Sequence, residues 1–278
     1  MTLIQILILA IIQGAAELLP VSSSAHVIMA EKLMGLDPTS PQMTLLLVML
    51  HTGTMFAVIA YFWRSWRETY FSSRHAFRTN ALHVVIATAL TGVVGLLLLQ
   101  LLKHLFAPGG QAFEVEQLFG NARLMAAALA CAGVLIMLSA RIKVQTAEPL
   151  SHRSAAVIGA VQGLCLPFRG FSRSGATISA GLVMGVERRR AEAFSFALAV
   201  VLTPAVIVKE VLRLAKTPAT AVPEGWLHAL APGLLGMVLS FLAGLAALRW
   251  LSRWLEQDRW HLFGAYCLLA SLVVLWVG

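Results

Sequence analysis

Two short polar tracts interrupt apolar stretches of this sequence, LLPVSSSAH at residues 18–26 and LPFRGFSRSGAT at residues 166–177. The first holds three consecutive serines and a histidine just after Glu17, and the second places Arg173 between two serines. Hydroxyl, imidazole and carboxyl groups carry out nucleophilic and acid–base chemistry, and a guanidinium can hold a phosphate through two hydrogen bonds. The tracts together indicate a site for a phosphate-bearing anion.

The backbone of each tract should also favour an anion. Ser22 to Ser24 precede one apolar half-helix and Ser172 to Ser174 precede another. The first turn of a helix offers free N–H groups and the positive end of the helix dipole, and hydroxyl- and glycine-rich turns suit phosphate oxygens.

The arginines of the second tract need a reason to lie in an apolar segment, because an unpaired charge there is costly. We interpret Arg173 as a phosphate ligand, with a structural ion pair to Glu17 as the alternative. Arg169 is either a second phosphate contact or a residue at the rim that faces water.

Glu17 lies four residues after Gln13, so both side chains point to the same side of a helix. A carboxylate at this position can coordinate a divalent cation, act as a base or neutralise Arg173. We favour the metal or acid–base role.

His26 lies four residues after Ser22 and three after Ser23, on the hydroxyl side of its half-helix. It can take a proton from a serine or give one to a leaving group. A histidine with a purely structural role is the alternative.

Other polar and aromatic residues are weaker candidates. His51 and Thr54 flank Gly53 and can close the wall of the cavity, although close helix packing explains them equally well. Ser195 is expected at a contact between helices. Five tryptophans beside basic loops indicate a belt at the membrane surface: Trp63, Trp66, Trp250, Trp254 and Trp260.

The composition is that of a membrane protein, with 59% hydrophobic and 12% charged residues. A net charge of +8 is compatible with nucleic-acid binding, but the basic residues fall in short loops between apolar spans, so no nucleic-acid partner is expected. Six uninterrupted apolar segments have about the 20 residues that cross a bilayer: 43–63, 82–102, 124–140, 193–212, 229–248 and 261–277.

Two further segments are too short to cross. Residues 3–13 and 25–35 each cover about 16 Å as a helix, and residues 154–166 and 174–186 repeat this layout around the second tract. We therefore predict an all-α membrane bundle of about six transmembrane helices plus two re-entrant hairpins of half-helices, at 3–35 and 154–186.

The hairpins suggest an internal repeat. One runs from Gln13-Gly14 to Met34-Gly35, and the other runs from Gln162-Gly163 to Met184-Gly185 with one extra residue. Residues 1–278 are predicted to form one membrane domain made of repeats at about 1–140 and 150–278. Three spans separate the hairpins, so the repeats should be inverted.

Positive charge predicts the orientation. Most lysines and arginines lie in four loops that would share one face, 64–80, 141–153, 187–190 and 249–259. This face is expected to be cytoplasmic, with both chain ends outside.

The sequence resembles the undecaprenyl-pyrophosphate phosphatases of bacterial inner membranes over nearly its whole length. The resemblance rests on QGAAELLPVSSSAH and GFSRSGATISAGLVMG, supported by HTGTMFAVIAYFW and EAFSFALAV. It implies hydrolysis of the C55 isoprenyl pyrophosphate to the monophosphate, which recycles the lipid carrier for peptidoglycan and other envelope polymers. It also implies a divalent cation, Mg²⁺ or Ca²⁺, a pocket open to the periplasm, and bacitracin resistance on overproduction.

The resemblance assigns roles to individual residues. The acidic metal motif falls on Gln13 and Glu17, and the serine–histidine group on Ser22, Ser23 and His26. The phosphate-binding motif falls on Ser172, Arg173, Ser174 and Thr177.

The sequence departs from the family pattern at three places. Gln13 stands where many members have a glutamate, Arg169-Gly170 replaces Pro-Gly, and Leu47 replaces a glutamate that some members carry. These departures bear on the metal site more than on the reaction.

Two questions stay open from the sequence. The attacking group is either a hydroxyl of Ser22 or Ser23 relayed through His26, or a water activated by Glu17 and His26. A polyprenyl-phosphate transporter or flippase is the alternative function, because inverted repeats with broken helices are typical of transporters. Packing of the hairpins is compatible with a homodimer.

Overall fold

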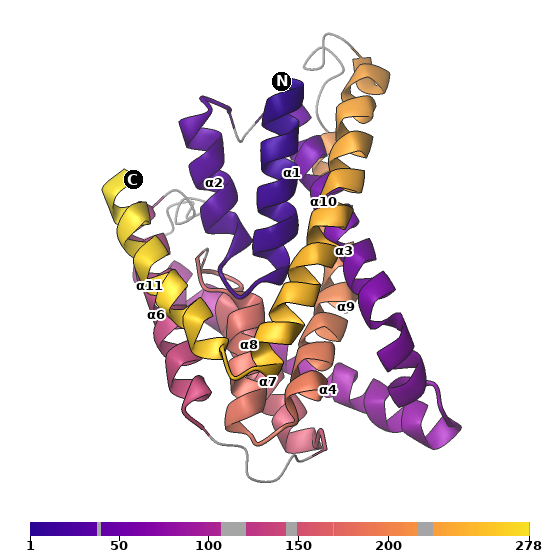
Figure 1. Ribbon diagram of the computed structural model, residues 1–278. Coiled ribbons are helices and arrows are strands. Elements are labelled where there is room, and N and C mark those ends of the chain that lie inside the picture. The colour runs from indigo at the N-terminus through magenta and orange to yellow at the C-terminus, as the bar shows by residue number, and fades with distance from the viewer. Residues whose placement is uncertain (38–39, 107–120, 143–148, 169, 216–224, 278) are drawn as a thin grey trace.

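The computed structural model describes residues 1–37, 40–106, 121–142, 149–168, 170–215 and 225–277. The regular elements in these ranges are ten helices, which confirms the predicted all-α fold (Figure 1). Their bounds are α1 Leu3–Leu18, α2 Ser23–Leu33, α3 Pro41–Tyr70, α4 Arg74–Phe106, α6 Ala122–Ala140, α7 His152–Cys165, α8 Arg173–Val183, α9 Arg188–Ala215, α10 Gly225–Glu256 and α11 Trp260–Val277.

Six of these helices are long and apolar enough to cross a membrane, namely α3, α4, α6, α9, α10 and α11. They coincide with the six predicted apolar segments, so the chain is a multi-pass membrane protein. The helices are longer than those segments: α3 begins after the N-cap Ser40 and continues to Tyr70. Hydropathy locates the part of a helix inside the bilayer, and the helix itself continues into its polar flanks.

The four short helices form two pairs that enter the bundle from opposite ends. Figure 1 shows α1 and α2 at the end that carries both chain termini and α7 and α8 at the other, with their connections meeting in the middle. This arrangement is consistent with the predicted half-helix hairpins. Helix α1 runs to Leu18 rather than ending near residue 13, because the chain first leaves the helix at Leu19, where the following Pro20 favours the observed extended backbone.

The first helix of each pair packs on a long helix of the other half of the chain, α1 on α10 and α7 on α4. Both contacts depend on glycine. A Cβ on Gly14 would lie 2.6 Å from the Cβ of Ala243, and one on Gly163 would lie 2.9 Å from the Thr91 carbonyl oxygen. Small residues let helices approach closely in membranes. Gly14 and Gly163 directly follow Gln13 and Gln162, which hold matching positions in the two halves. The division into inverted repeats stays a prediction.

Aromatic residues join α3 to α9. Phe62 stacks on Trp66 and on Phe196, and the Trp66 indole donates to the Ala193 carbonyl at 3.1 Å. Trp66 and Trp260 are therefore buried at 7% and 2% exposure, and their assignment to a surface belt was wrong. Loop proximity suggested a belt, but each indole N–H finds a partner inside the bundle.

Candidate active site

The two breaks begin their second helices in different ways. Ser22 is the N-cap of α2, with φ 67° and no hydrogen bond from its side chain to the helix. Ser172 is the N-cap of α8, with φ −63°, and its hydroxyl accepts from the Gly175 N–H at 3.2 Å. Before it, Gly170 adopts φ 100°, and a Cβ there would lie 2.3 Å from the Met125 carbonyl oxygen. Only glycine fits this turn.

Glu17 is the centre of the site. Its carboxylate accepts a hydrogen bond from Arg173 Nη2 at 2.9 Å and one from the Ser23 hydroxyl at 2.5 Å. The Gln13 amide donates to it at 3.3 Å, and His51 Nε2 lies 3.8 Å away. The structure therefore joins groups that lie 156 residues apart in the chain, as the two polar tracts predicted.

Arg173 has unused binding capacity. Its Nη2 is paired with Glu17, while its Nη1 is buried without a hydrogen-bond partner among the described residues. A buried, unpaired donor on a charged group is costly. A phosphate oxygen would satisfy it, because guanidinium groups bind phosphate through two nitrogens.

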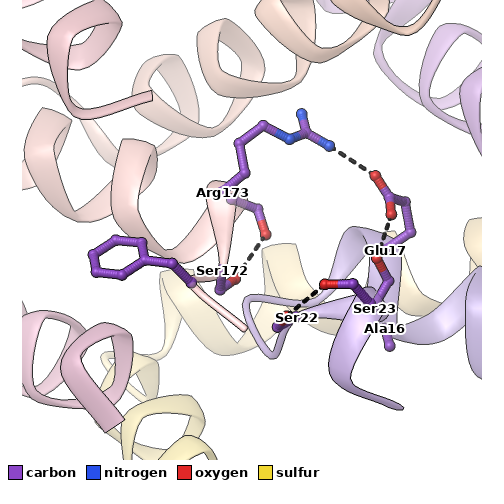
Figure 2. Close-up of a pocket in the computed structure, with 9 residues that line it drawn as sticks. Ala16, Glu17, Ser22, Ser23, Ser172 and Arg173 are labelled. Carbon is purple, nitrogen blue, oxygen red and sulfur yellow. Dashed lines mark hydrogen bonds and ion pairs between the residues drawn. The ribbon is translucent and has the colours of Figure 1, made fainter. Parts of the chain in front are cut away.

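These groups surround a cavity of about 110 Å³ between the two breaks. Figure 2 shows Arg173 and Glu17 pointing toward one another across it, with Ser22 and Ser23 on one side and Ser172 on the other. The lining residues are Ala16, Glu17, Ser22, Ser23, Ser24, Phe171, Ser172, Arg173 and Ser174. Hydroxyls, one carboxylate and one guanidinium thus meet in one small space.

The remaining predicted phosphate ligands have supporting contacts. Ser174 lines the cavity and donates to the Leu19 carbonyl at 3.2 Å, which ties the second break to the first. Thr177 is fully buried behind Arg173, bonded to its carbonyl oxygen at 2.8 Å and to the Ser195 hydroxyl at 2.6 Å. Ser195 is therefore at a helix contact, as predicted. Arg169 lies outside the described residues.

His26 is oriented away from the hydroxyls that it was expected to serve. Its Nδ1 lies 2.8 Å from the Ser22 carbonyl oxygen, and its Nε2 lies 2.7 Å from the Tyr266 hydroxyl. The hydroxyl of Ser22 is instead bonded to that of Ser24, and the hydroxyl of Ser23 to Glu17. The Glu17 carboxylate, rather than the His26 ring, is therefore the acceptor in contact with a serine hydroxyl.

A divalent cation has few protein ligands here. Among the described residues no three His, Cys, Asp or Glu side chains cluster in the way a metal needs. Gln13, 1% exposed, and Glu17 supply one amide and one carboxylate. Mg²⁺ is commonly held by one or two carboxylates together with substrate phosphates and water, so this pair fits a cation that arrives with a phosphorylated substrate.

Two residues at the site were missed or underweighted. His51 was treated as part of the cavity wall, yet it is 3.8 Å from the Glu17 carboxylate. Tyr266 was not considered, and its only signal in the sequence is a phenol hydroxyl within the apolar helix α11.

The fold and the site define a polytopic membrane protein with a polar cavity where the connections of two pairs of short helices meet. The chain belongs to the family described as bacitracin resistance protein BacA, whose profile matches residues 6–273. Undecaprenyl-diphosphatase 2 of Acinetobacter baylyi is 63% identical over 280 residues, covering 99% of this chain and 98% of that protein. Undecaprenyl-diphosphatase 1 of Burkholderia pseudomallei is 35% identical, covering 99% and 96%.

Proposed function

We propose that this chain hydrolyses undecaprenyl pyrophosphate to undecaprenyl phosphate and inorganic phosphate, and so recycles the lipid carrier for cell-envelope synthesis. The observation that carries the proposal is the Glu17 carboxylate, which is bonded both to the Arg173 guanidinium and to the Ser23 hydroxyl. Cleaving a phosphoric anhydride requires a cationic anchor, a nucleophile and a base for its proton, and these three groups supply them.

The substrate would bind with its isoprenyl chain among the helices and its pyrophosphate in the cavity. Its terminal phosphoryl group takes the free Nη1 of Arg173 and the N–H groups at the starts of α2 and α8. Ser172 and Ser174 add hydroxyls from the second break. This arrangement neutralises the charge that develops on the phosphoryl oxygens in the transition state.

Ser23 is the better placed of the two candidate nucleophiles, because its hydroxyl is the one on Glu17. Its Oγ attacks the terminal phosphorus as Glu17 takes its proton. The bond to the bridging oxygen breaks, and undecaprenyl phosphate leaves with that proton. Water then attacks the phosphoserine, giving its proton through Glu17 to the departing Ser23 oxygen, which releases phosphate. Direct attack by a water on Glu17 is the alternative.

We also propose a bound Mg²⁺ or Ca²⁺, held by Glu17 and Gln13 together with the substrate. Such a cation supplies electrostatic stabilisation of the phosphoryl oxygens. Gln13 would then turn its amide oxygen, rather than its N–H₂, toward the site.

Phosphate release by purified protein in detergent tests the function, because a detergent solution has no two sides between which a lipid can be moved. We expect metal-dependent release of phosphate from C55 pyrophosphate. Binding of the lipid without any release would instead favour the transporter alternative. Trapping a phosphoserine at Ser23 would identify the covalent route, whereas single-step ¹⁸O incorporation without a phosphoenzyme would identify the water route.

We further propose that the protein lies in the bacterial inner membrane with its basic loops in the cytoplasm and the cavity open to the periplasm. The ion pairs Arg188–Asp258 and Arg189–Glu256 join two of these loops, which supports their lying on one face. Labelling in intact cells with an impermeant maleimide tests the orientation, with Ser73→Cys and Gly35→Cys introduced one at a time into a variant whose three native cysteines are replaced. We expect Gly35→Cys to be labelled and Ser73→Cys to stay unlabelled. A homodimer is tested by the mass of the protein in detergent.

A further inference from the structure

The His26 ring is fixed at both of its nitrogens. The Ser22 carbonyl oxygen can only accept a hydrogen bond, so Nδ1, at 2.8 Å, must carry the proton. Nε2 of the neutral ring is then an acceptor, and the Tyr266 hydroxyl donates to it at 2.7 Å. The two rings also stack, with an interplanar angle of 13°. His26 thus links α11 to the backbone of the first break.

The backbone that His26 holds is the strained part of that break. Ser22 has φ 67°, a left-handed conformation that is unfavourable for any residue with a Cβ. Its side chain makes no capping hydrogen bond to α2. Such conformations persist only where the surroundings enforce them, and the Nδ1–H of His26 is the side-chain donor on the Ser22 carbonyl.

Helix α11 holds the same turn at a second point. The Cys267 thiol, next to Tyr266, donates to the Pro20 carbonyl at 3.2 Å. Residues 20 to 22 are therefore anchored by two neighbouring residues of α11, directly through Cys267 and through His26 from Tyr266. The residue that follows the anchored turn is Ser23, whose hydroxyl lies on Glu17.

We propose that Tyr266 is a positioning residue for the phosphatase reaction. It orients His26, His26 holds the left-handed Ser22 turn, and the turn places the Ser23 hydroxyl on the Glu17 carboxylate. This inference rests on the proposed function only in taking Ser23 and Glu17 as reacting groups. The chain of contacts from Tyr266 to Ser22 stands without it.

A double-mutant cycle tests the inference. Tyr266→Phe keeps the ring and removes the hydroxyl. We expect this variant to have a kcat about tenfold lower and a nearly unchanged KM, because small misplacements of reacting groups have effects of this order or more. The double variant with His26→Ala should be no slower than His26→Ala alone, because Tyr266 acts through His26. Tyr61→Phe is the matched control, since its hydroxyl bonds to Ser252 elsewhere, and it should retain activity. Additive effects in the cycle, or an unchanged kcat in Tyr266→Phe, would overturn the proposal.

A measurement independent of activity separates this inference from the proposed function. In protein with ¹⁵N-labelled histidines, His26 should appear as the Nδ1–H tautomer with a hydrogen-bonded Nε2. Tyr266→Phe should shift the Nε2 resonance toward the value of a free acceptor nitrogen. Resonances that do not respond to Tyr266→Phe refute the contact whatever the enzyme does. The expected shift in a protein without phosphatase activity would refute the reaction and leave the contact.

Discussion

The two breaks have similar sequences and similar positions in the fold, yet they differ in backbone strain, helix capping and burial. In the second, Ser172 caps α8 with ordinary backbone angles, and every residue from Ser174 to Leu182 is buried. In the first, the N-cap Ser22 has a strained, left-handed backbone and its side chain makes no hydrogen bond to α2. Ser23, Ser24 and His26 are only partly buried. We infer a division of roles: the second break holds Arg173 at the start of a capped, buried helix, and the first carries the groups proposed to react.

The two glutamines at matching positions, Gln13 and Gln162, show the same division. Gln13 of α1 donates to Glu17, at the centre of the site. Gln162 of α7 is fully buried and donates to the Thr91 hydroxyl, which itself bonds to the Gly159 carbonyl. One glutamine therefore contacts the candidate active site, and the other joins α7 to α4.

The largest effect should come from removing the charge of Arg173 in the second break. Arg173→Ala should lower phosphate release by about 10³-fold, the loss typical of removing a group that stabilises transition-state charge. Arg173→Lys should recover little, because an ammonium cannot form the two-nitrogen contact. Activity assays beside Arg64→Lys, an exposed arginine, provide the comparison. Near-normal turnover in Arg173→Ala would show that Arg173 is not needed for the reaction.

Removing either of two neighbouring hydroxyls in the first break should have very different effects on kcat. Ser23→Ala removes the hydroxyl on Glu17 and should lower kcat by about 10³-fold or more if Ser23 is the nucleophile. Ser22→Ala removes a hydroxyl whose one bonded partner among the described residues is Ser24, and it should have a small effect. Turnover by both variants in detergent checks this prediction. The reverse ranking would make Ser22 the nucleophile.

Adding a carboxylate should tighten metal binding at one break only. Chelation of divalent cations should abolish phosphate release, and Gln13→Glu should lower the cation concentration for half-maximal activity, because Mg²⁺ prefers carboxylate ligands. Gln162→Glu, at the matched position, should not lower it. Activity titrations with Mg²⁺ compare the three proteins, and activity that survives chelation would count against a required cation.

The smallest effect concerns stability, with opposite signs at the two N-caps. Ser22→Gly relieves a left-handed conformation and should raise the thermal stability, by an amount of order 0.5–1 kcal/mol. Ser172→Gly loses a capping hydroxyl and adds freedom to the unfolded chain, so it should lower stability by up to about 1 kcal/mol. Thermal unfolding in one detergent compares them. The same sign at both positions would argue that the breaks are equally strained.

Hydropathy and spacing were enough to predict the six spans and the two short pairs, because the bilayer imposes a length on each apolar segment. The positions of the two polar tracts also predicted that Glu17 and Arg173 lie in one site, since polar groups at membrane depth need partners. Spacing was misleading for His26: three- and four-residue offsets put it beside the serines, but its ring bonds to the Ser22 carbonyl and to Tyr266 of α11 rather than to a serine hydroxyl. The assignment of Trp66 and Trp260 to a surface belt was wrong for a similar reason: a position beside a loop does not reveal the buried acceptor of the indole N–H.

The sequence by itself determined which groups are present and that they must meet: an acid, hydroxyls, an imidazole and a guanidinium in a chain otherwise suited to lipid. Only the tertiary structure decided which group pairs with which. The bonds from Arg173 to Glu17 and from His26 to Tyr266 join residues 156 and 240 positions apart. Local periodicity carries no information about such pairs, because the packing of distant helices selects one partner for each side chain from several that the spacing allows.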